Sequence, residues 1–347
     1  MPQKKLLNFL KDCKRSLILM EVCGTHTVAI SKNGLRSLLP PNIRLISGPG
    51  CPVCVTPQAE IDASIELARR PGTIITTFGD MIRVPGTRTS LEKEKAEGSD
   101  VRVVYSPLDC LDIAKKEPGK EIVFIGVGFE TTSPAIAGTV LKAKKEKVKN
   151  FSVIPAFKLI PPALKAITEA KDIKVDGFIL PGHVSAIIGA DAYSFLKIPG
   201  VIAGFEAEDI LEAIGMIVKL IVARSRVPVQ IQYRSVVRPE GNPAAIKVLY
   251  EVFEPSDSNW RGIGTIKGSG LVFRDKYREF DALKKFDVNI QNAKEPAGCS
   301  CGSILKGTKT PPECKLFGKK CTPEYPVGPC MVSSEGACSA YYKYGNN

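Results

Sequence analysis

The sequence predicts an α/β protein with two Rossmann-like parallel-sheet domains and a cysteine-rich C-terminal domain. The chain has 347 residues, which is too long for one ordinary compact core. Short apolar runs alternate with amphipathic helical patterns over residues 16–223, as in parallel sheets covered by helices on both faces. Beyond about residue 226, glycine, proline and cysteine become frequent, and from Pro296 almost no periodic apolar pattern remains.

The predicted elements follow one another in a regular order. Strands are expected at residues 17–22, 43–47, 73–77, 102–105, 122–127, 151–154, 177–180 and 201–203. Helices are expected between them, for example at residues 60–69, 107–116, 135–147 and 206–224. Because long helices and the Pro-rich turn at 160–162 restart the pattern, we expect a first α/β domain at 16–130 and a second at 131–225. Residues 226–347, together with an N-terminal helix at 1–15, are expected to form the third domain.

The formal net charge of +12 comes in large part from lysine-rich helix faces such as residues 142–149. No aromatic residues interleave with that run, so we expect a solvated face or an acidic protein partner, and no nucleic acid. The apolar run at 17–20 is too short for a signal sequence or a membrane span. We therefore expect a cytoplasmic protein without membrane contact, a monomer that forms transient complexes.

The eleven cysteines are the strongest compositional clue. Structural disulfides are rare in the reducing cytoplasm. Cysteines at this number therefore indicate metal binding or thiol chemistry rather than a disulfide scaffold.

Four of the predicted strands lead directly into loops of reactive composition. These loops are CGTHT at 23–27, GPGCPVC at 48–54, GFETT at 128–132 and PGHVS at 181–185. Ligands of open α/β sheets bind beyond the carboxyl ends of the strands, so these loops are candidates for one site. Both histidines of the chain, His26 and His183, lie in them.

Cys23 and His26 lie three residues apart at a strand-to-helix turn. A thiolate and an imidazole at this spacing can share a metal ion or a proton. The N-terminus of the following helix is expected to lower the pKa of the thiol. The alternative is a buried structural cysteine beside a helix-capping histidine.

Cys51 and Cys54 form a CxxC pair beside a predicted strand-to-helix turn. This spacing and context favour a dithiol that cycles to a disulfide, or that transfers metal. Zinc is the rival interpretation, but a zinc ribbon needs a second CxxC, and the sequence has none.

The glycine-rich run at 126–128 resembles a nucleotide-binding loop only loosely. The dinucleotide fingerprint needs a third glycine or alanine where Thr131 stands, and no Walker-type lysine follows. Thr131 or Thr132 can instead cap the helix that Pro134 opens, and free backbone N–H groups there could hold a small anion.

Six cysteines gather near the C-terminus, among glycines and prolines. They are Cys299, Cys301, Cys314, Cys321, Cys330 and Cys338. Four thiolates hold a [4Fe–4S] cluster, and spacing alone does not choose four of the six. The absence of histidine in this region argues against a Cys–His zinc site or a Rieske centre, while a four-cysteine zinc site remains the alternative.

Taken together, these motifs resemble one family, the HypD family of [NiFe]-hydrogenase maturation. The resemblance covers CGTHT, GPGCPVCVTP, GFETT and PGHVS, the run GPCMVSSEGAC at 328–338, and AYY at 340–342. It extends from about residue 16 to 344. The cluster pattern of the family is C-x14-C-x6-C-x16-C, and this chain reproduces it with Cys299, Cys314, Cys321 and Cys338. By this match Cys301 and Cys330 are not ligands.

The resemblance implies a scaffold on which an iron ion carrying two cyanides and one carbon monoxide, Fe(CN)2CO, is built. The small chaperone HypC would share this iron with Cys23, with His26 near it. HypE, which carries a thiocyanate, would deliver cyanide. The Cys51–Cys54 dithiol and the [4Fe–4S] cluster would pass the electrons that the transfer needs.

The remaining motif residues fit the same implied role. They would line the cleft as proton donors or as hydrogen-bond partners of the cyanide nitrogens. These residues are His183, Glu130, Thr131 and Thr132.

Two other interpretations compete with the scaffold. One is a stand-alone [4Fe–4S]-dependent disulfide reductase that uses the same CxxC and cluster. The loop with Cys23 and His26 separates the two, because a reductase does not need it. The other is a structural zinc protein, which zinc without acid-labile sulfide would favour.

Overall fold

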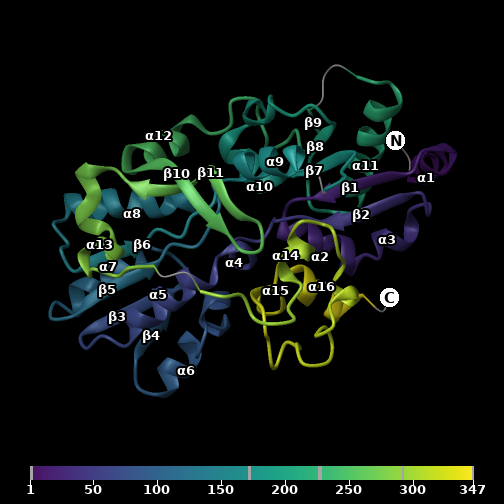
Figure 1. The fold of residues 1–347 in the computed structure, drawn as a ribbon. Helices are drawn as coiled ribbons and strands as arrows, with labels where there is room; N and C mark the ends of the chain where they lie inside the picture. Colours follow the sequence, from purple (N-terminus) through teal and green to yellow (C-terminus); the bar gives the residue numbers. More distant parts are fainter. Residues whose placement is uncertain (1–2, 171–172, 226–228, 291–292, 346–347) are drawn as a thin grey trace.

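The computed structural model describes residues 3–170, 173–225, 229–290 and 293–345. Within them the chain forms two parallel sheets and one antiparallel hairpin (Figure 1). The predicted α/β class with parallel sheets is therefore confirmed. The predicted boundary at residue 226 lies outside the described residues.

The larger sheet has the strand order β2-β1-β7-β8-β9, and all neighbouring strands are parallel. Its strands are β1 (Leu17–Glu21), β2 (Ile43–Ser47), β7 (Gly177–Pro181), β8 (Gly200–Ala203) and β9 (Val229–Ile231). The smaller sheet has the order β4-β3-β5-β6, again parallel. Its strands are β3 (Thr73–Thr77), β4 (Asp100–Val103), β5 (Glu121–Ile125) and β6 (Phe151–Ile154). The eight predicted strands all lie close to their predicted bounds.

The strands are divided between the sheets differently from the prediction. β1 pairs with β2 on one side and with β7 on the other, so that Leu19 lies opposite both Leu45 and Gly177. The consecutive strands β3 to β6 form the smaller sheet and are inserted between β2 and β7. The boundary expected near Glu130 therefore falls inside the smaller sheet, between β5 and β6. Apolar periodicity locates strands, but it does not show which strands pair.

Continuous apolar runs give both sheets two buried faces. Every residue of β3, β6, β7 and β8 is buried. Helices that share a core with the larger sheet are α1 (Gln3–Asp12), α2 (Gly24–Lys32), α3 (Leu35–Leu38) and α11 (Ala207–Val222). Helices around the smaller sheet are α5 (Gln58–Ala68), α6 (Leu91–Ala96), α7 (Asp109–Lys116), α8 (Ser133–Lys145) and α12 (Pro243–Val252). The helix α9 (Ile160–Glu169) contacts β11 (Gly264–Phe273) and shares a core with residues of both sheets.

We expected the N-terminal helix α1 to pack with the C-terminal segment, but it packs on the larger sheet instead. Its buried residues Leu6 and Leu10 belong to the core of the larger sheet and lie against α11. The apolar positions of a short amphipathic helix show that it has a partner surface, but they do not identify that surface.

The hairpin of β10 (Phe253–Trp260) and β11 (Gly264–Phe273) covers the end of the smaller sheet. Phe253 and Phe273 join the core of that sheet, and Leu159 donates a backbone hydrogen bond to Ser269 at 2.8 Å. The short helix α13 (Ala282–Lys285) follows and lies against β6. Residues after 226 therefore do not form one unit, because this part shares its core with the smaller sheet.

The C-terminal segment, residues 293–345, contains three short helices and lies beside α2 and α4 (Figure 1). The helices are α14 (Cys301–Leu305), α15 (Pro329–Val332) and α16 (Ala337–Tyr344), and α4 spans Pro52–Val55. Asp80 ties the segment to the smaller sheet, because its Oδ2 accepts hydrogen bonds from Ser333 Oγ and from Ser334 N and Oγ, at 2.9 to 3.1 Å. Among the described helices, none combines the length and the apolar composition needed to cross a bilayer.

The packing of α1 on α11 is testable by a cavity mutation. Leu10 is fully buried, so Leu10→Ala is expected to lower the free energy of unfolding by about 3 kcal/mol, as large-to-small core changes do. Urea denaturation measures this change. The matched control is Asn8→Ala on the exposed face of the same helix, which is expected to leave stability unchanged. Equal stability of the two variants would contradict the packing described here.

Candidate functional site

The four motif loops meet at a cavity of about 230 Å³ between the two sheets. Three of the loops follow β1, β2 and β7 of the larger sheet, and the fourth follows β5 of the smaller one. Parallel strands present their carboxyl ends at one edge, which explains why loops distant in sequence converge. The lining residues are Val22, Cys23, Thr25, Gly50, Pro52, Phe129, Thr131, Thr132, Pro181, His183, Val184 and Glu335.

Cys23 stands at the start of α2 and lines this cavity. The loop after β2 presses on it, because Gly24 N donates to Gly50 O at 2.8 Å. A Cβ atom at Gly50 would lie 2.2 Å from Cys23 N, so only glycine allows this approach. Burial raises the pKa of the Cys23 thiol to about 12. This corrects the expected lowering by the helix N-terminus, since loss of solvation outweighs the helix dipole.

A buried carboxyl group lies directly beneath Cys23. Glu21, the last residue of β1, accepts the Cys23 N–H at 3.2 Å and the Thr27 hydroxyl at 2.6 Å. Burial raises its pKa to about 7. The sequence analysis missed Glu21 because it ends an otherwise apolar strand. The sequence could have identified Glu21 as a site residue, because it is a single carboxylate at the end of a strand, next to a motif cysteine.

His26 does not line the cavity, although the sequence analysis paired it with Cys23. Its ring is fully buried, its Nε2–H donates to Gly204 O at 2.9 Å, and Nδ1 has no hydrogen-bond partner among the described residues. Burial lowers the pKa of His26 to about 4, so the ring is neutral. His26 is therefore a ring packed in the core, and its Nδ1 is a hydrogen-bond acceptor without a partner among the described residues.

His183 lines the cavity and is solvent-exposed at its wall. Its ring stacks on Phe205 with 4.0 Å between centroids, and His26 packs on the same phenyl ring at 4.9 Å. Phe205 thus orients both histidines of the chain, with His183 facing the cavity and His26 the core.

The GFETT loop divides its residues between cavity and core. Thr131 and Thr132 line the cavity. Glu130 is buried behind them, where Oε1 accepts the Ile160 N–H at 2.9 Å and Oε2 has no partner in the described part of the chain. Burial raises the pKa of Glu130 to about 8, so it is neutral at neutral pH. Glu130 therefore braces the loop against α9 and does not reach the cavity surface.

Cys51 and Cys54 are joined by a disulfide at the start of α4. Both are buried, and their neighbours Gly50 and Pro52 line the cavity that contains Cys23. The dithiol loop thus forms one wall of the Cys23 site, as expected from the convergence of the loops after β1 and β2.

The six C-terminal cysteines surround one small cavity. Its lining includes Cys299, Cys301, Cys314, Cys321, Cys330 and Cys338, with Ile304, Leu316, Phe317, Gly328 and Met331. Within the described residues, no group of three or more cysteine, histidine or acidic side chains stands ready as a metal site. The donor set nevertheless fits an iron–sulfur cluster, because thiols converge and Val327 N–H points to Cys321 Sγ at 3.3 Å.

Two of the six cysteines form a close pair. The sulfur atoms of Cys301 and Cys330 are 2.8 Å apart, and these are the two cysteines that the family pattern leaves out of the cluster. Cys330 lies on α15, which packs against α4 of the dithiol loop. Cys54, Cys301 and Cys330 belong to one buried core. The sequence analysis gave this pair no role. The feature of the sequence that could have identified the pair is that two cysteines beyond the four of the cluster pattern lie within the same segment.

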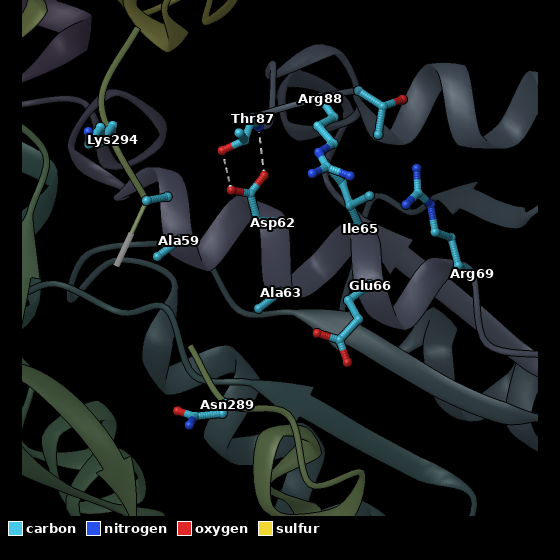
Figure 2. A pocket seen from close by; sticks show the side chains of 12 residues that line it. Ala59, Asp62, Ala63, Ile65, Glu66, Arg69, Thr87, Arg88, Asn289 and Lys294 are labelled. Carbon is cyan, nitrogen blue, oxygen red and sulfur yellow. Dashed lines mark hydrogen bonds between the residues drawn. The ribbon is translucent and has the colours of Figure 1, made fainter. Parts of the chain in front are cut away.

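A larger cavity lies elsewhere, along α5 and residues 87–89 (Figure 2). It has about 620 Å³, and no cysteine or histidine lines it. Figure 2 shows Asp62 turned towards Thr87, whose N–H and hydroxyl donate to it at 2.7 and 2.5 Å. Asp62 and Thr87 thus use their polar groups in hydrogen bonds to each other. The size of this cavity is therefore no evidence that it is the reactive site.

The fold and the site together define a class: an α/β protein whose candidate site is built from buried thiols at the strand ends of two parallel sheets. Comparison with known proteins identifies the family within this class. Residues 3–345 match the model of the HypD family, described as "Hydrogenase formation hypA family". The chain belongs to the HypD family of hydrogenase maturation factors.

Individual relatives agree with this assignment. The chain is 46% identical over 346 residues to hydrogenase maturation factor HypD2 of Bradyrhizobium diazoefficiens, which covers 96% of this chain and 91% of the relative. It is 46% identical over 345 residues to HypD of Azotobacter vinelandii, covering 96% and 91%. It is 45% identical over 337 residues to HypD of Escherichia coli, covering 95% and 90%.

Glu335 is a further cavity residue that the sequence analysis did not single out. It comes from the C-terminal segment, and its Oε1 accepts a hydrogen bond from the Thr25 hydroxyl at 2.8 Å. The C-terminal segment therefore supplies one wall of the Cys23 cavity. Its place inside the GPCMVSSEGAC motif, between two cysteines, was the signal that could have identified it.

The burial of Glu130 predicts a pH dependence of stability. Because its pKa is raised from 4.5 to about 8, the folded state holds a proton that the unfolded state releases. Stability from this group is complete below about pH 4.5 and is lost as the pH rises through about 8, by up to about 1.4 kcal/mol per pH unit. Glu130→Gln is expected to flatten this decline in urea unfolding between pH 5 and 8. The exposed control Glu66→Gln is expected to keep the wild-type slope, and an equal slope in Glu130→Gln would refute a neutral Glu130.

Proposed function

We propose that this chain is the scaffold and redox protein on which the Fe(CN)2CO centre of [NiFe]-hydrogenase is assembled. The iron is the cargo, shared between Cys23 and the HypC chaperone, and HypE is the cyanide donor. The observation that carries the proposal is the position of Cys23, a thiol at a cavity wall next to the loop of the Cys51–Cys54 disulfide. Membership in the HypD family supports it.

Cys23 must lose its proton to bind iron, because thiolate is the ligand form. Its raised pKa keeps the free thiol neutral, so the metal itself drives deprotonation. Glu21 lies beside it with a pKa of about 7 and is the nearby group that changes charge near neutral pH. Iron binding is accordingly a proton-releasing step at this site.

The residues on the opposite wall suit the bound diatomic ligands. Thr131, Thr132 and His183 line the cavity and carry hydroxyl or imidazole groups that can donate hydrogen bonds. Cyanide nitrogens are acceptors, so these side chains would orient them around the iron. His26 and Glu130, which lie behind the wall, would support the loops that carry these donors.

Cys51 and Cys54 supply the electrons for cyanide release. When the two thiols reduce the thiocyanate of HypE, its S–C bond breaks, cyanide leaves with the electron pair, and HypE recovers a thiol. The two cysteine sulfurs join as a disulfide, and of their two protons one goes to the HypE thiol and one to solvent. A disulfide between Cys51 and Cys54 is the product that this step would leave.

The disulfide must then be reduced before another cyanide is accepted. A [4Fe–4S] cluster held by Cys299, Cys314, Cys321 and Cys338 would supply single electrons for this. The packing of α15 on α4 supports a short route between the two sites. The close thiols Cys301 and Cys330 line the same cavity as these four cysteines and share a buried core with Cys54.

The alternative function is a stand-alone disulfide reductase with the same dithiol and cluster. The exposure of Cys23 to a cavity of its own favours the scaffold, because a reductase has no use for a third thiol there. In addition, Thr25 and Glu335 close this cavity from two different segments, which indicates a site built for a bound group.

Infrared spectroscopy tests the scaffold. Protein purified anaerobically with HypC is expected to show bands of iron-bound cyanide and carbon monoxide, and Cys23→Ala is expected to lose them because the iron has no ligand. Thiol-reductase turnover is expected to remain in the variant. Absence of the bands in wild-type protein from a strain competent in maturation would favour the reductase.

Iron and acid-labile sulfide analysis tests the cluster ligands. Cys314→Ser is expected to lose both, since a [4Fe–4S] cluster needs four thiolates. Cys301→Ser is the matched control from the same cavity, and it is expected to retain them. Loss of the cluster in Cys301→Ser would show that the ligand set differs from the family pattern, and zinc without sulfide in wild-type protein would refute the cluster itself.

A further inference from the structure

The turn of the β10–β11 hairpin lies outside the four motif loops, but it contacts the GFETT loop and the segment that follows Cys54. Trp260 at its start is fully buried, stacks on Phe129 of the GFETT loop with 6.1 Å between centroids, and donates its indole N–H to Ser269 Oγ at 2.8 Å. The next residue, Arg261, is also buried, with 2% of its surface exposed. A buried arginine on a hairpin turn needs a specific set of partners.

Nearly all partners of Arg261 lie on the segment that follows the disulfide. Its backbone N–H donates to Val55 O at 2.8 Å, and its Nε donates to Thr56 O at 2.8 Å. Both terminal nitrogens donate to Gln58 Oε1 at 3.2 Å. One residue thus fixes the chain from the end of α4 to the start of α5, immediately after Cys54.

The other side of the turn lies against the cysteine-rich segment. Gly262 has a φ of 68°, and a Cβ atom there would lie 2.1 Å from the Cα of Gly302 in α14. The backbones of the turn and of α14 are therefore in direct contact, next to Cys301. The hairpin turn therefore contacts the segment after the disulfide on one side and the helix that begins at Cys301 on the other.

The charge of Arg261 is incompletely balanced. Among the described residues its carboxylate partner is Glu295, whose side chain is 42% exposed, whereas the guanidinium is buried. The other partners, Thr56 O and Gln58 Oε1, are neutral dipoles. Because solvent screens the carboxylate more than the buried guanidinium, we expect the positive charge of Arg261 to act on the segment 55–58, which follows Cys54. A positive field favours thiolate and hence the reduced dithiol.

We propose that Arg261 is a positioning residue for the redox reaction of Cys51 and Cys54: it fixes their loop against α14 and holds a positive charge beside it, which favours the reduced form. The reaction is disulfide plus two electrons and two protons to two thiols, with a small dithiol as reductant in the test. The inference rests on the proposed function in one respect, that these cysteines are a redox couple.

Lys158 offers a matched control for a purely structural role. It is as buried as Arg261, its Nζ contacts Glu60 of α5 at 2.8 Å, and it contacts Ser258 of the same hairpin at 2.9 Å. Its partners link the hairpin to α5 without touching the segment 55–58 or α14. Loss of either side chain removes a buried cation and its ion pair, but only Arg261 contacts the segment that follows the disulfide.

The experiment measures the equilibrium between disulfide and dithiol at Cys51 and Cys54 in the full-length protein. Samples equilibrate anaerobically in dithiothreitol redox buffers, and alkylation with mass spectrometry gives the reduced fraction. Arg261→Gln is expected to shift the equilibrium about tenfold towards the disulfide, which is about 30 mV for a two-electron couple. Arg261→Lys keeps the charge and is expected to shift it less, and Lys158→Gln is expected to leave it unchanged even where it lowers stability.

The outcomes separate this inference from the proposed function. An unchanged equilibrium in Arg261→Gln, or an equal shift in Lys158→Gln, would overturn the role of Arg261 while leaving the dithiol a redox couple. If Arg261→Gln does not fold, Arg261→Lys decides, because a shift larger than that of Lys158→Gln supports the role and an equal one refutes it. A wild-type disulfide that no dithiothreitol buffer reduces would overturn the proposed redox function as well.

Discussion

The position of β1 between β2 and β7 is the constraint on which the site depends. The three strands are parallel, so the loops after them leave the sheet at the same edge. The loops after β1 and β2 then touch, and this contact requires the missing side chain of Gly50. Cys23, the Cys51–Cys54 disulfide and His183 are neighbours for this reason, although they are far apart in sequence.

Burial decides the charge state of the groups around this edge. The Cys23 thiol, the His26 ring and the Glu130 carboxyl are all neutral at neutral pH, because each loses more solvation than its hydrogen bonds return. These three groups therefore bring no charge to the site, and its acidic groups are Glu335 in the cavity wall and Glu21 beneath Cys23.

Much of this arrangement could be predicted from the sequence. The features that could not be predicted depend on burial and on contacts between distant segments. Apolar runs located eight strands, and reactive loops at four of their ends identified Cys23, His183, Thr131 and Thr132 as cavity residues. We predicted that His26 and Glu130 lie in the cavity, but both are buried behind it. A motif does not show which of its side chains face the core. Strand pairing, the partner of α1, and the approach of Glu335 and Arg261 depend on contacts between distant segments, which local patterns do not carry.

The insertion of the smaller sheet between β2 and β7 sets an order for synthesis. The strands β3 to β6 are consecutive and can pair as soon as they leave the ribosome. β1 and β2 can also pair with each other early, but the second edge of β1 must wait for β7, more than a hundred residues later. Until then the edge of β1 is open and Cys23, Cys51 and Cys54 are accessible to oxidants and to stray metal ions. A nascent chain of this protein is therefore most exposed to thiol oxidation and unwanted metal binding between the synthesis of Cys54 and the pairing of β7 with β1.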